Sequence, residues 1–500
     1  MDTVHSLVHG FSIALQVDNL LFCFFGVLIG TLVGVLPGIG PVGAISILLP
    51  VSFRMSPVSA IILLAGIFYG SQYGGSTTSI LVGIPGESFS IVTVLDGYQM
   101  ARQGRAGPAL GIAAFGSFIA GTLGVVGLML FASPLAEFAL NFGPPEYFGL
   151  FLLGLTLVIY LSFGSVIKGI MMGAFGLTLG CIGLDPMQGS PRMTFNIMQL
   201  WDGVNLVPVA MGMFGIAEVL INMETISSFE ILKTKIRNFF PTLSDWMRSK
   251  GAILRGTVIG FFIGLLPGGN AVIASFLSYT IEKRISKEPE RFGKGAIEGV
   301  AGPESANNAA TAGGLVPLFT LGLPTSVVMA LLFGALLIHG IRPGPFLLRD
   351  NPDLFWGVIS SMYIGNVMLL VLNLPLIPIW VQVLRVPARI LYPLILLFCI
   401  VGCYSVNDSA FDLVIMMIFG LVGYLFRKFQ YEAAPLLLAF VLGPMVEKSL
   451  RLSLTLSQGS LFIFFTRPIS AVLVSIAIIL FVTSFLSYLA KMKGRRQGAC

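Results

Sequence analysis

Long apolar runs recur along the whole chain and are separated by short polar segments. Each run approaches or exceeds the roughly 20 apolar residues that a helix needs to cross a bilayer, and on this basis we count roughly 10–13 membrane segments. The pattern predicts an all-α, polytopic integral membrane protein. The clearest runs are 108–133, 147–163, 165–184, 206–223, 356–383, 387–403 and 459–488.

Two of the apolar segments contain the same interruption. Residues 29–38 read I-G-T-L-V-G-V-L-P-G, and residues 259–268 read I-G-F-F-I-G-L-L-P-G. Pro lacks a backbone N–H and Gly has no side-chain restraint on φ, so a Pro-Gly pair breaks a helix. Matching breaks in the two halves are typical of transporters that are built from an internal repeat.

A second pair of matching motifs follows the first. Polar stretches cover 69–86 and 304–326, and each contains a Gly-Gly pair followed by Gly-x-Pro. The Pro-Gly breaks are 230 residues apart and the Gly-Gly pairs are 239 residues apart. Two ordered pairs of motifs make the repeat a firmer prediction than either pair alone.

The basic residues suggest where the repeats begin and how they are oriented. Basic loops lie on both sides of 252–280, and cytoplasmic loops are the ones that carry Lys and Arg. A re-entrant pair of short helices meeting at Pro267-Gly268 would place both loops inside, whereas one crossing would not. Only Arg54 lies near the first broken segment, which favours entry from the opposite face and therefore inverted repeats. A parallel repeat, a chance similarity, or one kinked helix over 252–280 are the alternatives.

The chain is accordingly divided into four parts. We expect a first transmembrane repeat (1–225), a basic cytoplasmic linker (226–251), a second transmembrane repeat (252–490) and a basic cytoplasmic tail (491–500).

The polar stretches and the breaks supply candidate binding groups. Hydroxyl, amide and glycine positions suit an anionic substrate, because glycine lets a ligand approach the backbone and helix N-termini attract anions. Free carbonyls at the breaks suit a cation such as Na⁺. The expected substrate-binding residues are Gly74, Gly75, Ser76, Thr77, Thr78, Asn307, Asn308, Thr311, Gly313 and Gly314, and the expected Na⁺ residues are Pro37, Gly38, Gly40, Pro267, Gly268 and Asn270. Close helix packing is the alternative role for any single small residue here.

Three acidic residues stand close to these stretches. Glu87 and Glu304 are interpreted as helix caps at the membrane interface, with binding of a coupling proton or cation as the alternative. Asp96 is expected in a solvated loop.

Composition supports a membrane transporter and excludes other classes. The 500 residues are 56% hydrophobic and 10% charged, against roughly 25% charged in soluble domains. The net charge of +6 comes from loops and tail, so it does not indicate nucleic-acid binding. No P-loop and no paired metal-ligand motif occurs, so we expect no enzyme activity and no cofactor. An ion channel or antiporter, or a membrane scaffold, remain the alternative classes.

Several long motifs resemble the large membrane subunit of the tripartite tricarboxylate transporters. The resemblance covers nearly the whole chain. The motifs are G-T-L-V-G-V-L-P-G-I-G-P (30–41), Y-G-G-S-T-T-S-I-L (73–81), I-P-G-E-S (84–88), L-D-G-Y-Q-M-A-R-Q-G-R-A-G-P-A-L-G-I-A-A (95–114), G-L-L-P-G-G-N-A-V-I-A-S-F (264–276), E-G-V-A-G-P-E-S-A-N-N-A-A-T-A-G-G-L-V-P-L-F-T-L-G-L-P (298–324) and G-I-R-P-G-P (340–345).

The resemblance implies a function and partners. Such a subunit works in the bacterial inner membrane with a small four-helix membrane subunit and a periplasmic solute-binding protein that delivers a carboxylate. Transport is expected to be secondary and driven by an ion gradient, with Na⁺ as the usual coupling ion and H⁺ as the alternative. Citrate and related tricarboxylates are the substrates that give the family its name.

Overall fold

The chain is almost wholly helical. A computed structural model describes residues 3–36, 40–161, 165–224, 239–383, 386 and 388–497, without the side chains of residues 485 and 487–497. Its strands, β1 (Gly183–Leu184) and β2 (Pro191–Arg192), form one short antiparallel hairpin. Among the described helices, eight are long and apolar enough to cross a membrane, and five shorter apolar helices accompany them. The prediction of an all-α, multi-pass membrane protein is confirmed.

The helical elements follow in chain order. They are α1 (Thr3–Ala14), α2 (Val17–Val35), α3 (Gly40–Ser52), α4 (Pro57–Val82), η1 (Ser88–Ser90), α5 (Ile91–Thr93), η2 (Val94–Tyr98), α6 (Gln99–Arg102), α7 (Ala106–Ala139), α8 (Pro144–Tyr160), α9 (Val166–Gly180), η3 (Met198–Leu200), α10 (Leu206–Ala210), η4 (Met211–Ile216), α11 (Ala217–Glu224), α12 (Leu243–Gly264), α13 (Ala271–Ile285), η5 (Pro289–Arg291), α14 (Glu298–Leu321), α15 (Val327–Ile338), α16 (Leu347–Asp350), α17 (Pro352–Asn373), α18 (Ile377–Val383), α19 (Ala388–Asn407), α20 (Ala410–Lys428), α21 (Ala433–Leu456), α22 (Ile463–Thr466) and α23 (Pro468–Gln497).

Both L-P-G sequences separate two helices. The first lies between α2 and α3, although Pro37 and Gly38 themselves are outside the described residues. The second lies between α12 and α13, where Gly268 has φ +78°, a conformation that favours glycine. The segment 252–280 is therefore interrupted and is not one kinked helix. Because α12 begins at Leu243, residues 243–251 of the expected linker are helical. The division of the chain into four parts stays a prediction.

The polar stretches do not interrupt helices, in contrast to the breaks before them. α4 continues to Val82 and α14 continues to Leu321, and each then ends at a left-handed glycine, Gly83 (φ 74°) or Gly322 (φ 66°). Some of the polar side chains bond to their own helix, as when Thr311 Oγ1 donates to the Asn307 carbonyl at 3.3 Å. The Gly-x-Pro motifs are therefore matching helix ends.

The two helix pairs that carry the motifs pack in the same register. A Cβ on Gly30 of α2 would lie 2.5 Å from the carbonyl oxygen of Ile67, and a Cβ on Gly260 of α12 would lie 2.1 Å from that of Ala306. Gly30 and Gly260 are 230 residues apart, and Ile67 and Ala306 are 239 apart, which are the offsets of the sequence motifs. The repeat thus extends to backbone-to-backbone packing. The orientation of the two repeats relative to the membrane stays a prediction.

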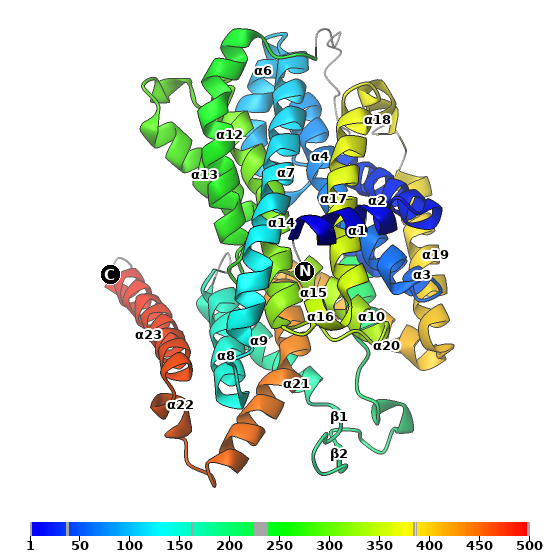
Figure 1. The fold of residues 1–500 in the computed structure, drawn as a ribbon, viewed down its shortest axis with the longest axis vertical. Coiled ribbons are helices and arrows are strands. Elements are labelled where there is room, and N and C mark those ends of the chain that lie inside the picture. The colour runs from blue at the N-terminus through cyan, green and yellow to red at the C-terminus, as the bar shows by residue number, and fades with distance from the viewer. Residues whose placement is uncertain are drawn as a thin grey trace.

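The later helices of each half cross over to the other half. α7 packs against α12 and α14, whereas α17 packs against α2 and α4. In the same way α20 contacts η4, and α21 contacts α8 and α9. Figure 1 shows α7, α12 and α17 running close to the long axis of the molecule, with the β1–β2 hairpin at one end. The halves are intertwined, so the region between the helix pairs is built by both.

Candidate functional site

A cavity of about 500 Å³ lies where equivalent segments of the two halves meet. Gln72 of α4 and Thr311 of α14 both line it, and they are 239 residues apart. Gly40–Gly43, at the start of α3, and Asn270–Val272, at the start of α13, line it as well. So do Pro85–Phe89 and Thr325–Met329, which follow the two Gly-x-Pro helix ends.

Gln72 is the cavity residue whose polar group most needs a ligand. Its side chain is fully buried, and neither its Oε1 nor its Nε2 has a hydrogen-bond partner among the described residues. Leaving a buried polar group unsatisfied costs about 1–3 kcal/mol. A polar molecule held in the cavity would supply the missing partner.

Three helices begin at the cavity. The Asn270 side chain caps α13 by accepting the Ile273 N–H at 3.0 Å, and the Ser326 hydroxyl caps α15 by accepting the Met329 N–H at 3.3 Å. α3 begins at Gly40, where φ is +67° and a Cβ would lie 3.2 Å from Glu87 Oε1. Helix N-termini carry partial positive charge, so the three together favour an anion in the cavity.

Charged side chains also reach the cavity. Arg427 lines it and forms an ion pair with Glu218, which lines it too. Glu87 and Glu432 add two further carboxylates, and Oε1 of Glu87 is buried without a hydrogen-bond partner among the described residues. Arg427 gives the cavity a guanidinium that can bind a carboxylate in a bidentate manner.

Sequence reasoning missed Arg427 because the residue lies far from both motif pairs. It is near the end of α20, where a basic residue is ordinarily interpreted as reaching toward the membrane surface. Only the packing of α20 against η4 and α11 brings its side chain beside Glu218.

The predicted ion-site residues are divided between the cavity and its surroundings. Gly40, Gly268 and Asn270 line the cavity. Pro267 does not line it and lies beside Gly154 of α8, while Pro37 and Gly38 are outside the described residues. Since the Asn270 Oδ1 already caps α13, it has less capacity left for a cation than the sequence suggested.

Two of the predicted substrate-binding residues, Ser76 and Asn307, converge on Glu304 instead of the large cavity. Ser76 Oγ donates to Glu304 Oε2 at 2.6 Å, and Asn307 Nδ2 donates to the same oxygen at 3.3 Å. Thr93 Oγ1 donates to Glu304 Oε1. Glu304 is fully buried in the interior of α14, so the interpretation of this residue as an interface cap is wrong.

The remaining predicted residues have packing or helix-capping contacts. Asn308 Nδ2 donates to the Glu304 carbonyl at 3.1 Å, and Thr78 Oγ1 donates to the Val35 carbonyl at 2.6 Å. Cβ atoms on Gly74, Gly313 and Gly314 would lie within 3.0 Å of other parts of the chain, whereas Gly75 has ordinary space. Thr77 lines a second, much smaller cavity.

Asp96 joins the two halves at one end of the molecule. Its Oδ1 accepts N–H groups of Gly293, Gly295 and Ala296 at 2.9, 2.7 and 2.8 Å, and its Oδ2 accepts the Tyr279 hydroxyl at 2.9 Å. Its side chain is fully buried, so the expectation of a solvated loop is wrong. The sequence gives no signal for this, because the partners are backbone groups about 200 residues away.

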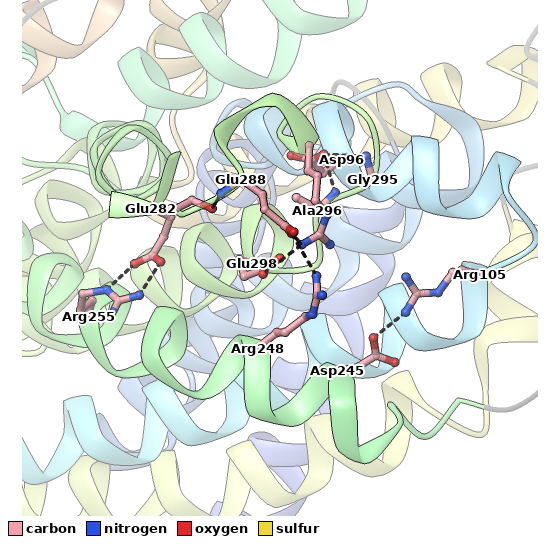
Figure 2. A network of polar contacts seen from close by, with 12 residues as sticks. Asp96, Arg105, Asp245, Arg248, Arg255, Glu282, Glu288, Gly295, Ala296 and Glu298 are labelled. Carbon is pink, nitrogen blue, oxygen red and sulfur yellow. Dashed lines mark hydrogen bonds and ion pairs between the residues drawn. The ribbon is translucent and has the colours of Figure 1, made fainter. Parts of the chain in front are cut away.

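Ion pairs surround this junction. Arg105 pairs with Asp245 at 2.5 Å, and Arg255 binds Glu282 through two hydrogen bonds of 2.7 and 2.6 Å. Figure 2 shows these pairs around Asp96 and the loop that carries Gly295 and Ala296. The junction is therefore a fixed connection between α7, α12, α13 and the segments beside α14.

A membrane-spanning bundle whose repeated halves enclose a polar cavity has the architecture of a transporter. The chain belongs to the tripartite tricarboxylate transporter TctA family, whose sequence pattern matches residues 20–438. It is a large subunit of this transporter family and not an enzyme. In the part of the chain that the structure describes, no group of three or more His, Cys, Asp or Glu could hold a metal ion.

Two curated relatives come from Agrobacterium vitis. The "uncharacterized 52.8 kDa protein in TAR-I ttuC' 3'region" is 50% identical over 486 residues, which are 97% of each chain. The "uncharacterized protein in TAR-II ttuC' 3'region" is 49% identical over 227 residues, which are 45% of this chain and 94% of the relative. No solved structure matches the chain.

Proposed function

We propose that the protein is the permease subunit for ion-driven uptake of a tricarboxylate or related carboxylate across a bacterial inner membrane. One observation carries this proposal: the 500 Å³ cavity is lined by equivalent segments of both halves. Its volume falls within the roughly 300–1,000 Å³ of small-molecule sites. A ligand between two repeats can be exposed to either side of the membrane when one half moves against the other.

The cavity chemistry suits a carboxylate. Arg427 offers a guanidinium, and the helices α3, α13 and α15 offer their N-termini. Gln72 offers an amide that has no hydrogen-bond partner among the described residues. These groups lie on different elements, so they can contact several carboxylates of one molecule. Citrate is the natural first substrate to test, because the family takes its name from tricarboxylates.

The same cavity charges favour cotransport with a cation. Among the described lining residues, Glu87 and Glu218 place two carboxyl groups beside the guanidinium of Arg427. Binding an anion where carboxyl groups outnumber the guanidinium is unfavourable unless a cation or proton accompanies it. We infer Na⁺ as the coupling ion, with H⁺ as the alternative.

The tripartite family implies two partners. We infer a small four-helix membrane subunit, and a periplasmic binding protein that captures the carboxylate and releases it into the cavity. The lipid-facing surfaces of the spans remain in the bilayer.

Reconstitution tests the proposal. Uptake of labelled citrate is measured in proteoliposomes with and without the small subunit, the binding protein and an inward Na⁺ gradient. We expect uptake that needs all three. Uptake that needs neither gradient nor binding protein would indicate a channel or exchanger, and the absence of flux for citrate and other carboxylates would indicate a scaffold.

A further inference from the structure

A second cavity lies beside Glu304, apart from the large one. It measures about 10 Å³, which is close to the space that one water-sized particle occupies. Its polar lining comes from three helices that lie far apart in the sequence. The lining residues with oxygen atoms in their side chains are Tyr73, Ser76 and Thr77 of α4, Ser117 of α7 and Asn373 of α17.

Two oxygens in this lining have no hydrogen-bond partner among the described residues. They are the Tyr73 hydroxyl and Oδ1 of Asn373. The two side chains are only 3% and 4% exposed, so bulk water does not satisfy them. The Asn373 amide nitrogen is already engaged, because it donates to the Leu369 carbonyl at 3.0 Å. Buried polar atoms almost always have a partner, so these two oxygens indicate a bound species.

A fully buried carboxyl group, that of Glu304, stands next to the same cavity. Ser76 donates to the Glu304 carboxylate at 2.6 Å and Ser117 donates to the Glu304 carbonyl at 3.4 Å. All the hydrogen-bonding side chains around the Glu304 carboxylate (Ser76, Thr93 and Asn307) are neutral, and no basic group is an ion-pair partner within the described residues. Each serine hydroxyl that gives its hydrogen to Glu304 keeps its lone pairs for another partner.

We propose that this cavity binds one monovalent cation of the size of Na⁺. The oxygens of Tyr73, Ser76, Thr77, Ser117 and Asn373 would ligate it, and the Glu304 carboxylate, which accepts the Ser76 hydroxyl, would balance its charge. Oxygen ligands suit hard cations. A single nearby carboxylate, with no acidic cluster among the described residues, suits one positive charge better than two.

This site lies elsewhere than the Pro-Gly breaks, where the sequence predicts the binding of Na⁺. Ser76 Oγ lies 3.2 Å from the Gln72 carbonyl, so the cation would sit one helical turn from a residue of the large cavity. If the proposed carboxylate uptake is correct, a cation here can fix the position of α4 relative to α14. It would thereby also fix the distance between Gln72 and Thr311 in the large cavity.

Thermal unfolding of the purified full-length protein in nanodiscs tests the binding without any transport assay. The melting temperature is measured at increasing NaCl concentration and without carboxylate. KCl or choline chloride makes up the remaining salt, so that the ionic strength stays constant. We expect a saturable rise of at least about 2 °C in Na⁺. An equal rise in choline, or no rise in Na⁺, would overturn the proposal.

Two substitutions and one control assign the site. Glu304→Gln should abolish the Na⁺-dependent rise. Tyr73→Phe removes only an oxygen that has no hydrogen-bond partner within the described part of the chain, so this variant should fold and should need at least about tenfold more Na⁺ for half the rise. Glu137→Gln, which changes an exposed carboxyl group of α7 that lines neither cavity, should keep the rise. If Tyr73→Phe responds like the wild type, the site is not here, even if Glu304→Gln fails to fold.

The result is separable from the proposed function. Na⁺ stabilisation that depends on Tyr73, in a protein that takes up no carboxylate, would contradict only the transport proposal. Carboxylate uptake that is driven by Na⁺ in a Tyr73→Phe variant with wild-type Na⁺ dependence would contradict only this site.

Discussion

Gln72 and Thr311 occupy equivalent positions in the two repeated helix pairs and line the same cavity from α4 and α14. The two residues are not alike in chemistry. Thr311 donates its hydroxyl to its own helix, whereas Gln72 has no partner among the described residues. A ligand between them would therefore gain most from Gln72 and would still contact both halves.

Replacing Gln72 by Leu should separate stability from transport. The substitution removes two buried polar atoms that have no partner in the described structure, so we expect the free energy of unfolding to stay unchanged or to rise by up to about 1 kcal/mol. Citrate uptake in proteoliposomes should fall at least about tenfold, because the ligand loses its amide contact. Wild-type uptake by a well-folded Gln72→Leu protein would remove Gln72 from the site.

Arg427 and Glu218 should show strong coupling in a double-mutant cycle. The side chains are 36% and 15% exposed. Arg427→Met should therefore lower the free energy of unfolding by on the order of 1 kcal/mol, because Glu218 loses its ion-pair partner. The pair Arg427→Met with Glu218→Leu should recover that stability but not the uptake of citrate. Recovery of uptake by the double variant would show that the guanidinium does not bind the substrate.

The sequence predicts the fold and the repeat well because both depend on local patterns. The Pro-Gly breaks, the Gly-Gly pairs and the apolar runs each act within one or two helical turns, and each is found where the pattern indicates. The site depends on contacts between distant segments. Ser76 is predicted from the sequence as a substrate-binding residue, but its partner Glu304 lies 228 residues away, and Arg427 carries no local signal at all.

The packing of the repeat can be tested at matched glycines. Gly30→Ala and Gly260→Ala each place a Cβ within 2.5 Å of a backbone carbonyl of the neighbouring helix, so both should destabilise the protein by about 1–3 kcal/mol. Gly169→Ala in α9 is the control, since its Cβ would lie 3.4 Å from Ile159, an ordinary contact. Thermal melts that show a loss at only one of the two matched positions would contradict equivalent packing.

The β1–β2 hairpin should become less firmly held in acid. The N–H groups of Met187 and Gln188, and then Arg451, lower the pKa of Asp185 to about 2. Because the pKa of Asp185 is lowered in the folded protein, its ionised carboxylate stabilises the fold. This stabilisation is complete above the ordinary pKa of about 3.9 and is lost as the pH falls toward 2.

The corresponding variant is Asp185→Asn. Its melting temperature should lie below that of the wild type by a constant amount between pH 5 and 8, and the gap should narrow below pH 4. The exposed Asp202→Asn is the matched control and should show almost no gap at any pH. A gap for Asp185→Asn that is as wide at pH 3 as at pH 6 would contradict the role of its ionised form.

The crossing of helices between halves has a consequence for biosynthesis. α7 is complete before α12 and α14 are translated, yet these are the helices that it packs against. Its glycines at 116 and 124, which approach Ser305 and Ala312 in the finished protein, must meanwhile face lipid or a temporary neighbour. The first half therefore enters the membrane with one surface of α7 still unpacked. This surface can be covered by α12 and α14 only after the second half has been inserted.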